Sequence, residues 1–265
     1  MSLPAQLVLW LALPSLVAAA PLAGTVRLAS DDWCPFICAS HGQINGGYLV
    51  DLTRQALAPS GLQVASLLLP LNRAVSETAA GAIEGVYAPS TDPRLQLSVP
   101  LAYSRACFYT LAGVAWRYRG GESLHALRVG VIADYGYDDG EMDAYIAQHR
   151  DSSASLAFAF GDAAGLTNLQ KLLRGRFPVW LEHEAVARQL VAKLGAASRI
   201  RQAGCLAQAL PLTIGFAAHD ARAGQWLQAL ADGLRSLSAS GQLAALRARY
   251  HLLPDEAATP APNAR

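Results

Sequence analysis

The stretch LRVGVIADYGYDDGEMDAYIAQH, residues 127–149, decides the fold because it restarts a pattern already present near the N-terminus. Residues 127–132 are typical of a buried strand, residues 133–140 of a turn rich in Gly and Tyr, and residues 141–149 of a helix. The alternation continues with strands predicted at 155–160 and 177–182 and helices predicted at 161–173 and 184–194. Strands that alternate with helices are typical of α/β layers built around parallel sheets.

The same alternation precedes this stretch. It begins with the strand VRLAS at 26–30, and the helical spacing of GYLVDLTRQALA at 47–58 ends at the turn residues PSG. Further strands are predicted at 62–69, 83–87 and 104–114, and further helices at 72–80, 225–237 and 242–250. The sequence therefore predicts an α/β protein in which one set of layers is followed by a second.

The two ends of the chain differ from the rest. Residues 7–20, LVLWLALPSLVAAA, form an uncharged apolar run that is short for a membrane span and is followed by small residues. We expect residues 1–23 to be a signal peptide that is cleaved near Ala19 to Ala23, and the mature protein to be periplasmic. The Ala- and Pro-rich tail, 255–265, is predicted to be disordered.

Composition limits the possible partners. A formal net charge of +1 and a charged content of 15% give no field that favours nucleic acid or an acidic membrane. Four cysteines, an even number in an exported protein, predict two disulfide bonds, and we expect no metal and no cofactor. About 240 residues remain after the signal peptide, which is enough for two lobes with their own cores, and we expect a monomer.

Four motifs occur in a characteristic order along the mature chain: VRLASDDWCPF at 26–36, GGYLVDLTRQAL at 46–57, GAIEGVYAPSTDPR at 81–94 and GQLAALRARY at 241–250. Together they resemble the family 3 solute-binding proteins, which serve polar amino-acid uptake systems and related receptors. The resemblance implies a small polar ligand, bearing a carboxylate, that is captured by closure of two lobes. An inner-membrane ABC permease or a membrane sensor would be the partner.

The resemblance also implies a type II periplasmic-binding-protein-like fold. Each lobe would be a mostly parallel sheet flanked by helices. Lobe 1 would comprise 24–114 and 211–254, and lobe 2 would comprise 115–210. Two crossing strands, near 107–113 and 210–216, would form the hinge, and the ligand would lie between the lobes at the carboxyl ends of strands.

Ligand contacts in the first lobe follow from the resemblance. Arg94 falls at the family's carboxylate-binding arginine, and a guanidinium presents two parallel donors to a carboxylate. Arg73 lies near the cleft in related sequences, although a surface role is an open alternative for both arginines. Trp33 and its neighbours Asp31 and Asp32 occupy the loop that carries an acidic residue and a stacking aromatic, and a position in the core is the open alternative for Trp33. Tyr87 stands where the family has small hydroxyl residues.

The second lobe would supply three further contacts. Tyr135 and Tyr137 belong to the turn ADYGYDDG that leads into a helix, where backbone N–H groups can bind an anion. Glu182, in the stretch RGRFPVWLEHE, would pair with a ligand ammonium group. Packing within the lobe is the alternative for the two tyrosines. His183 is expected at the surface or at a helix cap.

The cysteines suggest two local hypotheses. WCPFIC resembles the loops of thiol–disulfide oxidoreductases, but three residues separate Cys34 from Cys38 and no helix follows directly. We therefore expect a local Cys34–Cys38 disulfide, with redox catalysis as the alternative. Cys107 and Cys205 are either a second disulfide close to the hinge or two buried thiols.

No G-x-S-x-G, H-E-x-x-H or phosphate-binding glycine loop is present, so we expect a binding protein and no enzyme. One enzymatic alternative remains open. A few proteins of this architecture are dehydratases of cyclic prephenate-like acids, which use a cleft carboxylate as general acid. Glu182 would take that role.

Overall fold

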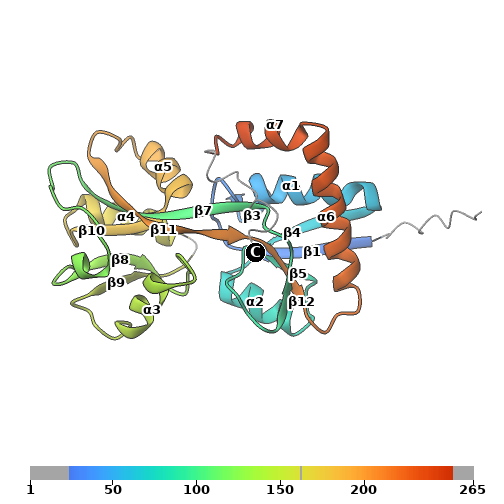
Figure 1. Cartoon of the computed structure of the whole chain (residues 1–265), viewed down its shortest axis with the longest axis horizontal. Coiled ribbons are helices and arrows are strands. Elements are labelled where there is room, and N and C mark those ends of the chain that lie inside the picture. Colours follow the sequence, from blue (N-terminus) through green and yellow to red (C-terminus); the bar gives the residue numbers. More distant parts are fainter. Residues whose placement is uncertain (1–23, 162, 253–265) are drawn as a thin grey trace, which may run out of the picture.

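The computed structural model describes residues 24–161 and 163–252. The predicted signal peptide, 1–23, and the predicted disordered tail, 255–265, lie outside the described residues. Two five-stranded sheets, each flanked by helices, form two lobes (Figure 1). The predicted α/β fold class is therefore confirmed. Among the described residues, no helix combines the length and the apolar character that a membrane span requires.

The first sheet has the strand order β4-β1-β5-β12-β6. Strands β4 and β5 run parallel to β1, whereas β12 is antiparallel to both of its neighbours. The strands are β1 (Gly24–Ser30), β4 (Leu62–Leu68), β5 (Gly85–Tyr87), β6 (Leu95–Leu97) and β12 (Ile214–Ala217). The helices of this lobe are α1 (Tyr48–Leu57), α2 (Leu71–Ala79), α6 (Ala223–Ala239) and α7 (Gln242–Arg249), and a short hairpin is formed by β2 (Cys38–Ser40) and β3 (Gln43–Gly46).

The second sheet has the order β11-β7-β10-β8-β9. Strands β8, β9 and β10 are parallel, and β7 is antiparallel to β10 and β11. The strands are β7 (Ala102–Leu111), β8 (Val129–Ile132), β9 (Leu156–Ala159), β10 (Val179–His183) and β11 (Ile200–Leu212). The helices are α3 (Glu141–Gln148), α4 (Ala164–Leu173) and α5 (Glu184–Lys193).

Strands β7 and β11 pair along most of their length and run from the second lobe towards the first (Figure 1). Both belong to the second sheet, so residues 102–111, which the sequence places in the first lobe, are part of the other sheet. The expected crossing strands at 107–113 and 210–216 therefore differ from the observed strands in their bounds. The chain returns to the first sheet at β12, which begins directly after Thr213.

Helix α1 shows how packing supports the site. Its apolar residues face the core, and Leu49, Leu52 and Ala56 are buried. Helix α6 packs against α1 so closely that a Cβ at Gly233 would lie 2.0 Å from the carbonyl oxygen of Ala56. This contact fixes α1, and Gly47 before it places Tyr48 N–H 2.8 Å from the carbonyl of Pro35 in the loop that follows β1. The helix pair thereby holds a loop that faces the second lobe.

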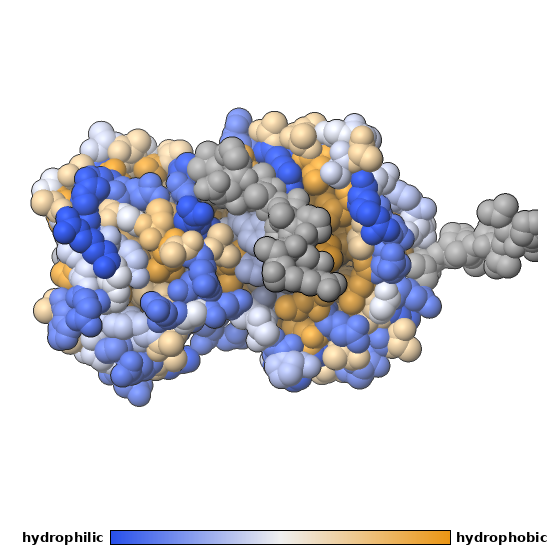
Figure 2. All heavy atoms as spheres, in the orientation of Figure 1, coloured by the Kyte–Doolittle hydropathy of each residue, from blue (hydrophilic) through white to orange (hydrophobic). Residues whose placement is uncertain are grey.

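The two lobes also pack on each other. The largest apolar cluster combines residues of the first lobe with Ala185 and Val186 of α5, and Tyr135 packs against the same cluster. The space-filling view shows the outline narrowing between the lobes (Figure 2). The lobes are thus in contact while a cavity remains between them.

Candidate functional site

A cavity of about 200 Å³ lies between the two lobes. The first lobe contributes residues from the loop after β1 and from β2. The second lobe contributes the ends of β8 and β10 and parts of α4 and α5. Four residues predicted from the sequence line the cavity: Asp32, Trp33, Tyr135 and Glu182. Their position at strand ends is where open α/β sheets bind ligands.

Trp33 is the aromatic residue of the first lobe that lines this cavity. Its side chain is buried, and its ring lies 5.0 Å from His183 and 6.3 Å from Tyr135, edge to face in both cases. Both partners belong to the second lobe. The indole Nε1 is buried and has no hydrogen-bond partner among the described residues. Trp33 therefore contacts both lobes while its indole N–H stays without a partner among the described residues.

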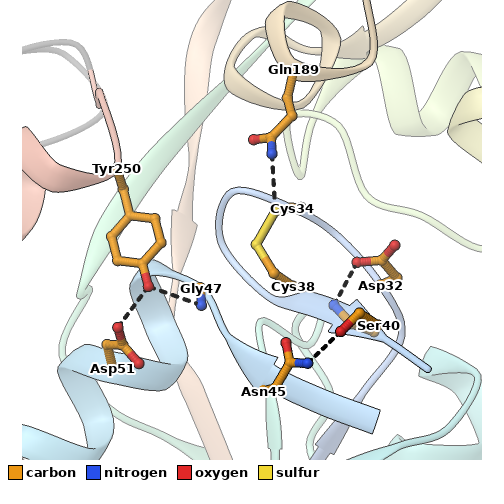
Figure 3. The surroundings of a disulfide bond; sticks show 10 residues. Asp32, Cys34, Cys38, Ser40, Asn45, Gly47, Asp51, Gln189 and Tyr250 are labelled. Carbon is orange, nitrogen blue, oxygen red and sulfur yellow. Dashed lines mark hydrogen bonds between the residues drawn. A yellow bond between two sulfur atoms is a disulfide. The ribbon is translucent and has the colours of Figure 1, made fainter. Parts of the chain in front are cut away.

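The loop acids beside Trp33 have separate roles. Asp32 lines the cavity, and one of its carboxylate oxygens accepts the N–H of Ala39 at 2.9 Å, which braces the loop against β2 (Figure 3). Asp31, the preceding residue of the same loop, accepts a hydrogen bond of 2.6 Å from the Tyr135 hydroxyl. Burial and the Asp31 carboxylate together raise the pKa of Tyr135 well above its usual value. This hydrogen bond connects the lobes across the cleft.

We predict that Tyr135→Phe opens the lobes. The change removes a hydrogen bond to a charged acceptor, which contributes about 1.5–3 kcal/mol, and keeps the ring in place. We expect a larger radius of gyration by small-angle X-ray scattering. Tyr145→Phe is the control, because the Tyr145 ring stacks on His149 within the second lobe. An unchanged radius for Tyr135→Phe would show that the hydrogen bond does not hold the lobes together.

Glu182 is the most unusual group in the site. It lies near the end of β10 and is completely buried. Its Oε1 accepts the N–H of His183 at 2.9 Å, whereas Oε2 has no hydrogen-bond partner among the described residues. Oε2 lies against the first turn of α4, where a Cβ at Gly165 would be 3.0 Å away. Burial raises the pKa of Glu182 to about 8, and the charge of Asp31 adds to the shift.

His183 differs from its expected surface position. It is completely buried, and burial lowers its pKa to about 4, so the ring is neutral. Its Nε2 lies 3.1 Å from the carbonyl of Gly136, and its ring stacks on Tyr137 at 5.6 Å. Side chains point alternately to the two faces of a strand, so extending the predicted strand to residue 183 would have predicted that His183 and Glu182 lie on opposite faces of the sheet.

Tyr137 and Tyr87 are buried away from the cavity. The Tyr137 hydroxyl accepts the N–H of Ile132 at 2.8 Å inside the second lobe. The Tyr87 hydroxyl is 2.9 Å from the Ser66 hydroxyl, and burial raises its pKa to about 12. Both side chains pack within their own lobes. Packing within the lobe was the open alternative for Tyr137 and for Tyr135, and it describes Tyr137, whereas Tyr135 lines the cavity.

Arg94 and Arg73 also lie outside the cavity. Asp92, two residues earlier, accepts both the backbone N–H and the guanidinium of Arg94, and the Arg94 side chain is 58% exposed. Arg73 pairs with Glu77 one turn along α2 and is 64% exposed. Each arginine is thus satisfied by a local carboxylate. A sequence motif predicts where an arginine stands in the chain, but it does not predict whether a neighbouring carboxylate pairs with that arginine.

Both disulfides considered from the sequence are present, Cys34–Cys38 and Cys107–Cys205. Cys34 lines the cavity, and its sulfur accepts a hydrogen bond of 3.2 Å from Gln189 of α5 (Figure 3). The residues after Cys34 form a turn and then β2, and the next helix begins only at Tyr48. A thiolate at Cys34 would therefore lack the helix N-terminus that activates thiols in oxidoreductases.

The structure has well-aligned neighbours among solved proteins. A histidine kinase sensor domain with similarity to periplasmic binding proteins aligns with a TM-score of 0.72 at 18% identity, over 86% of this chain and 96% of that one. This chain has a periplasmic-binding-protein-like fold. An ancestral arginine-binding protein bound to arginine aligns at 0.69 and 18% identity, over 86% of this chain and 99% of that one.

A third neighbour is the amino acid ABC transporter substrate-binding protein AbpA from Streptococcus pneumoniae, with a TM-score of 0.67 and 16% identity over 86% of this chain and 94% of that one. No protein-family model and no curated protein matches the sequence. The assignment of a periplasmic-binding-protein-like fold therefore rests on the structural alignments, and the resemblance to family 3 remains a prediction from the sequence.

Proposed function

We propose that this protein is a solute-binding protein whose ligand carries a cationic nitrogen that binds beside Glu182, in the cavity between the lobes. The observation that carries the proposal is the Oε2 atom of Glu182, which is buried at the cavity without a hydrogen-bond partner among the described residues. A positively charged ligand group would stabilise such a buried, unpaired carboxylate more than a neutral or negative group would.

The charges that line the cavity support this ligand class. Asp32 and Glu182 are acidic, and Lys193 of α5 is the basic residue among the lining residues. Trp33 adds an aromatic ring, which attracts cations. The resemblance to family 3 implied a carboxylate group on the ligand, recognised by Arg94. Because Arg94 is paired with Asp92 outside the cavity, a ligand carboxylate would have to meet Lys193 instead.

A thermal-shift screen tests the proposal. The mature protein is heated with amines such as putrescine, lysine and arginine, and with succinate and other dicarboxylates without nitrogen. A ligand at a hundredfold excess over its Kd stabilises the folded state by about 2.7 kcal/mol, which raises the melting temperature. Stabilisation by dicarboxylates and by none of the amines would refute the proposed ligand class.

The pH dependence of binding provides a sharper test. With a pKa of about 8, Glu182 is mostly protonated at neutral pH and has to release its proton when a cation binds. Amine affinity should therefore rise about tenfold per pH unit below pH 8 and level off above it. Calorimetry in two buffers of different ionisation enthalpy should report about one released proton. Affinity that falls as pH rises would indicate a carboxylate ligand bound by protonated Glu182.

We further propose that the protein works outside the cytoplasm and that a membrane protein recognises its ligand-bound form. The neighbours include both an ABC transporter substrate-binding protein and a kinase sensor domain, so a permease and a sensor are both compatible with the fold. N-terminal sequencing of the exported protein tests cleavage near Ala19 to Ala23. A mature protein that still starts at Met1 would contradict export by cleavage.

The raised pKa of Glu182 also favours one enzymatic alternative. A carboxylic acid that keeps its proton at neutral pH can act as general acid in a dehydration. Incubation with prephenate-like cyclic acids, followed by mass spectrometry, separates the two functions. Loss of water from the substrate would favour the dehydratase, whereas binding without turnover supports the solute-binding protein.

A further inference from the structure

The outer edge of the second sheet lies far along the sheet from the hinge strands. Strand β9 is the last in the order β11-β7-β10-β8-β9 and pairs with β8 on one side. The carbonyls of Ser155 and Ala159 accept N–H groups on the β8 side. Because backbone groups alternate along a strand, the backbone groups of Leu156 and Phe158 face away from β8. The Leu156 N–H donates to the Ser152 carbonyl at 3.0 Å, which leaves the Leu156 carbonyl and the Phe158 backbone at the open edge. Such an edge is a template for a further strand.

A hollow of about 510 Å³ follows this edge. We call it the basic edge groove, because four basic side chains line it together with three phenylalanines: Arg128, Arg150, Lys171, Arg176, Phe158, Phe160 and Phe177. One acidic residue, Asp151, is also part of the lining. The basic residues come from segments on both faces of the sheet, so positive charge surrounds the open edge of β9.

Within the described part of the chain, carboxylates neutralise only some of the basic residues of the groove. Arg150 pairs with Asp134 at 2.9 Å, and the Lys171 Nζ lies 3.5 Å from the carbonyl of Phe158. Arg128 and Arg176 both line the groove and are exposed. The groove thus presents an excess of positive charge on a protein whose formal net charge is only +1.

Phe160 provides an apolar contact at one end of the groove. Its side chain is 73% exposed, the largest exposure among the large hydrophobic residues that the structure describes. The ring lies 6.4 Å from that of Phe158. Phe160 also borders a second hollow, next to Leu71 and Asn72 of the first lobe. Phe160 therefore leaves an exposed aromatic ring at the end of the groove, which an apolar side chain of a partner would cover.

We propose that the basic edge groove binds an acidic, extended segment of a partner protein, which pairs with the outer edge of β9. Hydrogen bonds to the Leu156 carbonyl and to the backbone of Phe158 would fix the segment, its carboxylates would meet Arg128 and Arg176, and an apolar side chain would cover Phe160. Strand addition with side-chain selection is a common mode of peptide recognition. Complementary charge directs the encounter and excludes basic partners. The proposal is independent of the ligand in the cavity.

The test uses a short fluorescein-labelled peptide that alternates Glu and Val, with fluorescence anisotropy as readout. We expect saturable binding that weakens as salt is added, and no comparable binding of a peptide that alternates Lys and Val. The double variant R128A/R176A should weaken binding about tenfold or more. Arg174→Ala is the matched control, because Arg174 is exposed at the end of α4 and does not line the groove.

Two further measurements make the result decisive. A Glu/Val peptide that is N-methylated at alternate residues should lose binding, because it cannot complete the strand pairing. Equal binding of the methylated peptide, equal binding of the Lys/Val peptide, or an unchanged double variant would each overturn the proposal. Binding of the protein to phosphatidylserine vesicles without peptide binding would also overturn it, since the groove would then serve an anionic membrane. Far-UV circular dichroism confirms that each variant is folded.

Discussion

Glu182→Gln is expected to weaken the binding of a cationic amine by about a hundredfold, while a dicarboxylate of similar size loses much less. The substitution keeps the size and shape of the side chain and removes its ability to ionise. Loss of one partner of a buried charge pair costs about 2–5 kcal/mol, and a hundredfold change in Kd corresponds to about 2.8 kcal/mol. Isothermal titration calorimetry with an amine found by the screen measures the change directly.

Glu184→Gln is the matched control for this experiment. Glu184 is the first residue of α5, two positions from Glu182, and its carboxylate lies 3.9 Å from the Arg188 guanidinium outside the cavity. We expect its amine affinity to equal that of the wild-type protein. Equal losses of amine and dicarboxylate binding in Glu182→Gln would show that Glu182 serves the fold alone and contacts no ligand charge.

The largest expected effect on stability is at Gly233. Replacement by Ala would place a Cβ 2.0 Å from the carbonyl oxygen of Ala56 and 2.6 Å from its Cα, both of which are backbone atoms of the facing helix α1. Backbone cannot move aside as a flexible side chain can, so α1 and α6 have to separate. We expect Gly233→Ala to lower the free energy of unfolding by about 3 kcal/mol or more, measured by urea denaturation.

Gly224→Ala tests the same chemical change in the same helix. A Cβ at Gly224 would have no heavy atom within 4 Å, so the variant gains helix propensity without a clash. Its free energy of unfolding should stay equal or rise by up to about 1 kcal/mol. If both variants behaved alike, the close approach of α6 to α1 would not limit stability.

The strand and helix order was predictable because hydrophobic periodicity and turn residues act locally. Helix α5 was expected at 184–194 and is observed at Glu184–Lys193, and α1 was expected at 47–58 and is observed at Tyr48–Leu57. Strand β11 was largely missed. Its sequence, IRQAGCLAQALPL, contains Gly204 and Pro211 and has no strict alternation, and its register shifts twice against β7. Pairing with a long neighbouring strand stabilises it in spite of weak propensity.

The candidate site was predictable in part. The loop after β1 and the end of β10 were selected by their positions in motifs, and they supply Trp33 and Glu182 to the cavity. Arg94 was selected in the same way, but whether a long side chain reaches a cleft depends on the nearest carboxylate, and Asp92 lies closest. The link between Asp31 and Tyr135 joins residues of different lobes. Such a contact arises from tertiary packing and has no signal in local sequence.

The disulfide between β7 and β11 restricts how the two lobes can move. The strands are paired from Ala102↔Leu212 to Leu111↔Ile200, and Cys107–Cys205 joins them within the ladder. The two connections therefore cannot slide past each other, because sliding would break the ladder and strain a covalent bond. Any rotation of one lobe relative to the other would have to take place in the short segments between the end of the ladder and the first sheet, near Leu101 and Thr213. Oxidation of this cysteine pair thus adds a covalent link to a ladder of hydrogen bonds, so that the two connections behave as one two-stranded unit.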